Sequence, residues 1–168
     1  MIGAIFAHRG MISAFLGDGI LATFGAPLPD PEHAWHAAHA AVAMQAALAE
    51  LNRGWAAADL PTLRMGIGIH TGVVFAGNVG GAQRMTYTVI GDPVNVTARL
   101  ESLNKDFGTA ILLTEETQVR LGARVETRYC GESLVKGRAQ PLRVYELLTV
   151  HPDGGPPGSK GGGEVEGR

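Results

Sequence analysis

The chain of 168 residues has little cysteine, little charge and no long hydrophobic run, and each shortage excludes a class of protein. Its single cysteine, Cys130, cannot form an internal disulfide, which is typical of a protein kept in a reducing cytoplasm. The formal net charge is −2 and basic residues form no run, which argues against a nucleic-acid partner. No apolar run reaches the roughly 20 residues that cross a bilayer, so we expect no membrane segment and a cytoplasmic location.

Apolar residues, in contrast, make up 45% of the chain, which is enough to build one domain with a buried core. We place this domain at residues 1–150. The last residues, 151–168, are rich in glycine and proline and have almost nothing to bury, so we expect them to be disordered.

The most informative stretch, residues 87–101, changes from a strand pattern to a helix pattern. Its first part alternates, with Tyr87 and Val89 on one side, as a strand does. Gly91 should end the strand, and the next residues suit a helix start, with Asp92 as the capping residue and Pro93 at the first helical position.

Asn95 and Arg99 lie four residues apart in this expected helix and therefore share one face. An amide beside a fixed cation suits a polyphosphate substrate, because an asparagine can orient a ribose and an arginine can stabilise charge developing on a phosphoryl group. A helix with solvated side chains would show the same spacing, so the spacing alone leaves both interpretations open.

Two short apolar runs, residues 12–16 and 20–24, flank Gly17-Asp18-Gly19, which is a strong hairpin signal. An aspartate in such a turn can serve the backbone geometry. It can also bind magnesium, because a hard cation prefers carboxylate oxygens. Both roles are open for Asp18.

The remaining pattern predicts an alternation of helices and strands. We expect helices over residues 2–11, 31–52 and 115–121, strands over 63–75, 108–114, 125–129, 133–135 and 142–150, and a mobile turn over 77–82. Glycines inside the strand over 63–75 indicate that another backbone or a ligand approaches closely there.

Two groups of polar residues invite a binding role. His33, His36 and His39 recur every three residues, but this spacing drifts around a helix and no carboxylate is clearly placed to complete a metal site. We therefore expect a solvated, partly packed surface. Lys136 and Arg138 fall on a turn between strands, where ordinary surface charge is the default interpretation.

Three stretches together resemble the catalytic domain of class III nucleotidyl cyclases, the adenylate and guanylate cyclases. They are residues 15–19 with 24–27, residues 66–72, and the stretch 87–101 with its sequence YTVIGDPVNVTARLE. The match runs in the family's order from about Ile5 to about Leu148.

This resemblance implies an α/β (α+β) sandwich of the ferredoxin-like type that acts as a homodimer, or as a heterodimer with another cyclase domain, with each active site shared between two subunits. It implies conversion of ATP to cyclic AMP and pyrophosphate with two Mg²⁺ (or Mn²⁺) ions per site. The implied roles are metal ligand for Asp18, purine reader for Thr88, ribose and transition-state contacts for Asn95 and Arg99, and phosphate contacts for Lys136, helped by Arg138.

The sequence departs from the family at two places. The family selects the purine with a lysine, or with a glutamate in guanylate cyclases, and this chain has Ala14 at that position. Thr88 is then the one residue that favours ATP over GTP, so a guanylate cyclase is an alternative. The family's first strand, with its other metal-binding aspartate, should precede Ile2, so we expect about 40 residues, a strand and most of a helix, to be missing.

We therefore expect unpaired strand edges in the sheet and no turnover by this chain alone. A catalytically dead cyclase-homology module that pairs with another chain is a second hypothesis. A ferredoxin-like nucleic-acid binder is a third, but it would need a basic surface and exposed aromatic residues, and neither is evident.

Overall fold

The computed structural model describes residues 1–81, 84–134 and 141–151. Its elements in chain order are α1 (Ile2–Ala7), β1 (Met11–Leu16), β2 (Gly19–Thr23), α2 (His33–Ala57), β3 (Ile67–Ile69), β4 (Phe75–Gly81), β5 (Arg84–Ile90), α3 (Asp92–Phe107), β6 (Ile111–Thr114), α4 (Glu115–Leu121), the 3-10 turn η1 (Gly122–Arg124), β7 (Val125–Ser133) and β8 (Leu142–Val150). The tail expected to be disordered lies outside the described residues, apart from His151.

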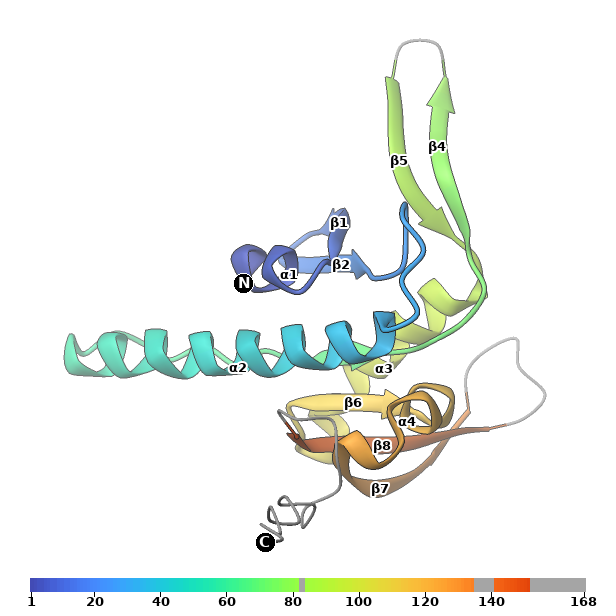
Figure 1. Ribbon diagram of the computed structural model, residues 1–168. Helices are drawn as coiled ribbons and strands as arrows, with labels where there is room; N and C mark the ends of the chain where they lie inside the picture. The colour runs from blue at the N-terminus through green and yellow to red at the C-terminus, as the bar shows by residue number, and fades with distance from the viewer. Residues whose placement is uncertain (82–83, 135–140, 152–168) are drawn as a thin grey trace, which may run out of the picture.

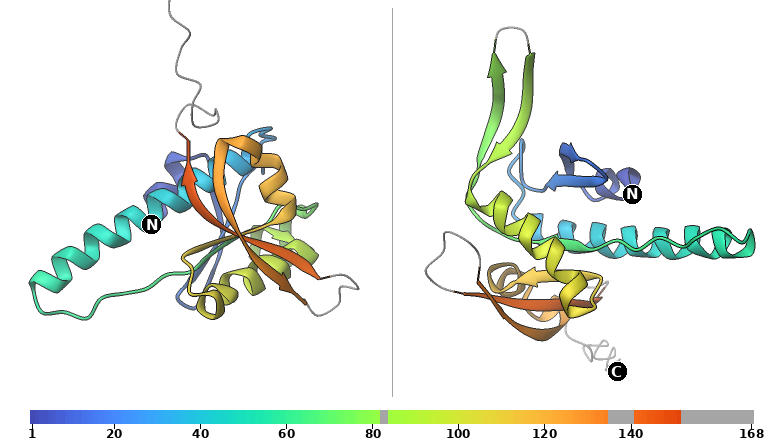
Figure 2. Two further views of the ribbon diagram at one scale, coloured as in Figure 1. Left: turned by 90° about the horizontal axis from the view of Figure 1, so that it is seen from below. Right: turned by 180° about the vertical axis from the view of Figure 1, so that it is seen from behind.

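A four-stranded sheet in the order β3-β6-β8-β7 forms the centre of the fold. β3 runs parallel to β6, whereas β8 runs antiparallel to both β6 and β7. The side chains of β6 alternate between the two faces: Ile111 and Leu113 pack with the alanines of α2, and Leu112 packs with Leu100 and Leu103 of α3. The sheet is thus covered by helices on both faces, which confirms the predicted mixed α/β sandwich (Figures 1 and 2).

Two further pairs of strands form separate sheets. β1 and β2 form the hairpin predicted from the Gly17-Asp18-Gly19 turn, and α1 packs beside it against α2. β4 and β5 form a ribbon that projects from the body of the domain (Figure 1). The expected sheet is therefore divided into three parts among the described residues.

The first long helix differs from its prediction at both ends. It was expected over residues 31–52 but spans His33–Ala57, so Gly54 lies inside the helix. Nothing lies within 4 Å of a Cβ added at Gly54, so packing does not require a glycine there, and a helix-interior glycine costs about 0.5–1 kcal/mol relative to alanine. Two residues before the N-cap residue Glu32, Asp30 accepts a hydrogen bond from the backbone N–H of Glu32 through its Oδ1 at 2.9 Å.

The strand predicted over residues 63–75 is wrong in its extent, because this range contains the short strand β3, Ile67–Ile69, and only the first residue of β4, Phe75. Residues 58–66 instead run back along α2, whose side chains hold them (Figure 1). Asn52 exchanges two hydrogen bonds with the backbone of Leu63, and Gln45 donates one to the carbonyl oxygen of Met65 at 2.8 Å. These side chains satisfy the backbone groups that a strand partner would otherwise take.

The turn predicted over residues 77–82 is also wrong, since β4 continues to Gly81 in unbroken register with β5. Cross-strand pairing here overrides the low strand propensity of glycine. Further along, the two strands expected over 125–129 and 133–135 are one strand, β7, up to Ser133.

The helix of the signature stretch begins one residue earlier than predicted. Gly91, with φ of +151°, is the N-cap, and Asp92 is the first helical residue rather than the cap. Asp92 remains favourable in the first turn because a carboxylate there complements the helix dipole. The close approach predicted for the glycines of β3 is confirmed: a Cβ on Gly68 would lie 2.5 Å from the backbone nitrogen of Glu101 in α3.

Candidate functional site

The structure places Asn95 and Arg99 on the first turns of α3, and both side chains are exposed. Val96 and Leu100 each follow one of them directly and are buried, so the adjoining face of the helix is fixed in the core. Asn95 and Arg99 therefore lie on a rigid element, and an amide and a guanidinium are presented together towards solvent.

Asp18 lies in the turn between β1 and β2, where Gly17 has φ of +65°. The aspartate is exposed. The end of β1 beside it is apolar, and Phe15 and Leu16 are 62% and 59% exposed. The carboxylate of Asp18 therefore lies beside an exposed apolar surface formed by Phe15 and Leu16.

Thr88 in β5 lies close to β1, the strand that contains Ala14. The hydroxyl of Thr88 donates a hydrogen bond to the backbone carbonyl oxygen of Ser13 at 3.4 Å, and Ala14 is the next residue, half-buried. The fold therefore brings together the two positions to which the resemblance assigns purine selection, although 75 positions separate Thr88 from Ser13.

Lys136 and Arg138, the expected phosphate contacts, lie outside the described residues.

A site for two divalent ions needs several carboxylate oxygens in one place. Within residues 1–81, 84–134 and 141–151, no three or more histidine, cysteine, aspartate or glutamate side chains come together in a way that could hold a metal ion. Asp18 is one carboxylate, and these residues do not fit a complete two-ion site.

Two of the three histidines of α2, His36 and His39, have protein partners. Nδ1 of His36 lies 2.6 Å from Oδ2 of Asp30, and His39 packs between the rings of Trp35 and His8. Burial lowers the pKa of His39, and the nearby His8 and His36 lower it further. Burial would raise the pKa of Asp30, but the hydrogen bonds from His36 and from the Glu32 backbone outweigh it, and the pKa is lowered.

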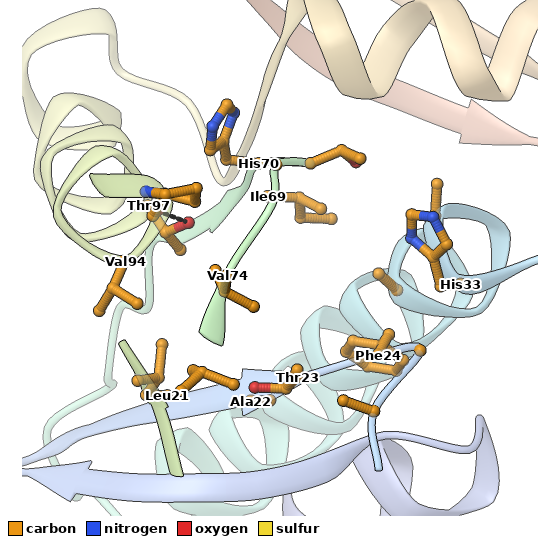
Figure 3. Close-up of a pocket in the computed structure, with 18 of the residues that line it drawn as sticks. Leu21, Ala22, Thr23, Phe24, His33, Ile69, His70, Val74, Val94 and Thr97 are labelled. Atoms are coloured by element: carbon orange, nitrogen blue, oxygen red, sulfur yellow. Dashed lines mark hydrogen bonds between the residues drawn. The ribbon is translucent and has the colours of Figure 1, made fainter. Parts of the chain in front are cut away.

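A large cavity of about 690 Å³, which we call the central cavity, was not predicted from the sequence. It lies between β2, α2 and β3, and the base of β5 and the start of α3 close its remaining side (Figure 3). Tyr87 and Val89 line it, which agrees with the predicted alternation of β5, whereas Asp18, Thr88, Asn95 and Arg99 do not. The central cavity and the candidate residues are therefore distinct features.

None of the described helices combines the length and the apolar character that crossing a membrane would require.

The family described as the adenylate and guanylate cyclase catalytic domain matches residues 12–149. Adenylate cyclase 1 of Rhizobium meliloti (strain 1021) is 40% identical over 146 residues, which cover 87% of this chain and 22% of the relative. An adenylate cyclase of Anabaena cylindrica is 38% identical over 151 residues, covering 86% of this chain and 29% of the relative. The chain thus spans less than a third of the length of either relative.

Solved structures give the same result at the level of the fold. The guanylyl cyclase Cya2 superposes with a TM-score of 0.80 at 36% identity, covering 90% of this chain and 76% of that chain. The adenylyl cyclase CyaB from P. aeruginosa superposes with a TM-score of 0.79 at 31% identity, covering 90% and 78%.

Proposed function

Because the chain belongs to the adenylate and guanylate cyclase catalytic domain family, we propose that it is a unit that converts ATP to cyclic AMP and pyrophosphate in signal transduction. In this proposal the ribose 3′-oxygen forms a bond to the α-phosphorus, and the bond from that phosphorus to the leaving pyrophosphate breaks. The hydroxyl proton passes to solvent. Asn95 orients the ribose, and Arg99 stabilises the negative charge that grows on the phosphoryl oxygens.

The proposal rests on one observation: the candidate residues Asn95 and Arg99 are exposed and lie near exposed apolar side chains. A guanidinium stabilises a transition state most strongly where water is excluded, yet Arg99 is exposed in a single copy of the chain. Phe75 and Ile90 face each other at the base of the β4–β5 ribbon, next to the start of α3, and are 64% and 50% exposed. We infer that a second cyclase domain covers this surface and encloses the site.

The second copy also supplies the complementary residues. In the proposed homodimer, Asp18 of one subunit meets Thr88, Asn95 and Arg99 of the other, so the exposed apolar residues beside Asp18, namely Phe15 and Leu16, become part of the interface. The family is metal dependent, and Asp18 is the described residue that we propose as a ligand of Mg²⁺ or Mn²⁺.

ATP is the nucleotide that we propose. Thr88 supplies a hydroxyl near the position of Ala14, and the two curated relatives compared above are named adenylate cyclases. A methyl group at position 14 cannot hydrogen-bond to a purine, so we propose that GTP is also accepted, with a modest preference for ATP.

A mixed assembly tests the proposal. The purified chain is combined with a catalytic domain of CyaB in which the residues aligned with Asn95 and Arg99 are replaced by alanine, and gel filtration establishes that a mixed dimer forms. Asp18 alone is not the set of carboxylates that two divalent ions need, so we expect the 168-residue chain alone, even as a homodimer, to make no cyclic AMP with Mn²⁺ and ATP. We expect the mixed dimer, to which the CyaB domain adds its own metal ligands, to make it. A mixed dimer that forms and stays silent would overturn the assignment of Asn95 and Arg99.

One observation favours a second function, that of a cyclase-homology module without catalysis of its own. The described residues gather no set of acidic side chains for a metal. If the chain is such a module, the mixed dimer should form and make no cyclic AMP, whether or not this chain carries Arg99→Ala. The proposed catalytic role requires the mixed dimer to make cyclic AMP and requires Arg99→Ala to lower that activity.

A further inference from the structure

A bulge interrupts β1 immediately before Ala14. The pairing of β1 with β2 shifts between Ile12 and Ala14, so Ser13 has no counterpart in β2. A bulge leaves its extra residue outside the ladder of backbone hydrogen bonds and changes the direction of the side chains that follow, and bulges are frequent beside active sites. Ser13 is therefore placed to interact with a partner outside the hairpin.

A pair of hydroxyl groups holds this bulge in place. Ser13 is only 5% exposed, and its Oγ lies at hydrogen-bonding distance, 2.6 Å, from Oγ1 of Thr23 at the end of β2. Burying a hydroxyl group is unfavourable unless it forms a hydrogen bond, so the buried Ser13 hydroxyl depends on Thr23. The two residues thus fix the bulged part of β1 across the hairpin.

The backbone carbonyl of Ser13 determines how the Thr88 hydroxyl can act. Thr88 donates to this carbonyl oxygen at 3.4 Å, and within residues 1–81, 84–134 and 141–151 this is the one hydrogen bond of the Thr88 hydroxyl. A hydroxyl group has a single hydrogen to donate and two lone pairs that accept. Because the hydrogen is directed at Ser13, Oγ1 of Thr88 presents only its lone pairs to any further group.

An acceptor at this position distinguishes the two common purines. Adenine carries an amino group, which is a donor, on carbon 6, whereas guanine carries a carbonyl oxygen, which is an acceptor. A hydroxyl oxygen that can only accept binds the amino group and has no hydrogen for the carbonyl oxygen. Thr88 can therefore favour adenine without a donor at position 14, where Ala14 has only a methyl group.

We propose that Ser13 and Thr23 are positioning residues for purine selection. The bulge that they hold keeps the Ser13 carbonyl beside Thr88, which makes the Thr88 hydroxyl an acceptor and selects nucleotides with a donor on carbon 6 of the purine. Ser13 is buried and acts through Thr88. The inference rests on the proposed function, in which Thr88 contacts the purine.

Three triphosphates that differ on carbon 6 test the direction of this hydrogen bond. ATP carries an amino group there, purine riboside triphosphate a hydrogen atom, and inosine triphosphate a carbonyl oxygen. Each is given to the mixed dimer, whose working site contains Thr88 of this chain, and we expect kcat/KM to fall in that order by about three- to tenfold at each step. Equal values for ATP and purine riboside triphosphate, or a higher value for inosine triphosphate than for ATP, would overturn the proposal.

Matched variants test the positioning role. Ser13→Ala and Thr23→Val each remove one hydroxyl group of the pair and should lower the ratio of kcat/KM for ATP over purine riboside triphosphate by about threefold or more. Thr23→Ser keeps the hydroxyl group and should keep the ratio. Thr71→Val is the control for a merely structural effect, because it breaks a similar pair, Thr71 and Thr117, whose Oγ1 atoms lie 3.1 Å apart, and it should leave the ratio unchanged.

Thermal melting shows which variants are folded, and either Ser13→Ala or Thr23→Val alone is sufficient for the test. A ratio that survives the removal of the hydroxyl group, or that Thr71→Val lowers equally, would overturn the positioning role.

The inference can be separated from the proposed function. If the mixed dimer forms and makes no cyclic product from any of the three nucleotides, the proposed function fails. Calorimetry of the same mixed dimer then gives the dissociation constants of the three nucleotides. Tightest binding of ATP and weakest binding of inosine triphosphate would still support the inference, whereas equal constants or no binding would overturn it.

Discussion

The hydroxyl of Thr88 donates a hydrogen bond to the backbone carbonyl oxygen of Ser13 at 3.4 Å. This contact ties β5 to β1 and holds the position of Ala14 next to that of Thr88. Two residues to which the resemblance assigns a purine-reading role therefore belong to one local structure, although neither lies near the other in the sequence.

Nucleotide preference should depend on position 14. Ala14→Lys adds a donor beside Thr88, and we expect the ratio of kcat/KM for ATP over GTP in the mixed dimer to rise by about tenfold or more, because a buried polar contact discriminates far better than an apolar one. The matched control is Ala22→Lys on the neighbouring strand, which lines the central cavity instead. An unaltered ratio for Ala14→Lys would mean that the purine is read elsewhere.

Arg99→Ala should lower kcat by about 100-fold while KM changes by less than about threefold, because the guanidinium interacts most strongly with charge that appears in the transition state. Steady-state kinetics of the mixed dimer measures both constants. Lys105→Ala removes an exposed cation from the last turn of the same helix and should have little effect. A rise in KM alone would instead assign Arg99 to ground-state binding.

Association of two copies should depend on the apolar base of the β4–β5 ribbon. Phe75→Lys replaces an exposed aromatic ring with a charge, and we expect the dimer dissociation constant to rise by about tenfold or more. Sedimentation velocity across a range of concentrations measures it. Val119→Lys, at an exposed position of α4, serves as the control, and equal effects of the two variants would place the interface elsewhere.

Gly68→Ala should destabilise the fold by about 1–3 kcal/mol or more, because the added Cβ would lie 2.5 Å from the backbone nitrogen of Glu101 and 2.8 Å from the carbonyl oxygen of Thr97. Gly54→Ala is the matched control, since nothing lies within 4 Å of its added Cβ. Within α2 it should stabilise the protein by about 0.5–1 kcal/mol. Urea denaturation compares the two, and similar values would contradict the close approach of α3.

Stability should fall as the pH decreases from 7 to 5. The folded state lowers the pKa of His39 through burial and the nearby His8 and His36, and it lowers the pKa of His33 through burial and Arg120. Their stabilising contribution is therefore complete above the ordinary histidine pKa of about 6.5 and is lost as the pH falls through the folded-state pKa. His39→Gln should weaken the dependence of the free energy of unfolding on pH, as measured by urea denaturation between pH 7 and 5. A dependence as strong as that of the parent protein would contradict the assignment.

The sequence predicted the elements whose patterns are local. The Gly17-Asp18-Gly19 turn, the helix carrying Asn95 and Arg99, and the short helix α4 were all identified, because turn chemistry and helical spacing are encoded within about ten residues. The family was identified from motifs of the same length.

The errors concern contacts between distant residues. Residues 63–66 were predicted as strand, but Asn52 and Gln45 of α2 bind their backbone. The glycines of β4 were predicted as a turn, but pairing with β5 makes them a strand. The central cavity was missed for the same reason, since it depends on how β2, α2 and β3 are placed relative to one another.

The β4–β5 ribbon is connected directly to the start of α3, so movement of the ribbon can reach that helix. Its pairing runs without interruption from Phe75 and Ile90 at the base to Gly81 and Arg84 at the far end. Neither strand can slip past the other without breaking this ladder, so the two strands should move together. Ile90 is joined to α3 through Gly91 alone, so a displacement of the base of the ribbon should also move the turn of α3 that carries Asn95. We therefore expect a partner that binds the far end of the ribbon to shift Asn95 without contacting it.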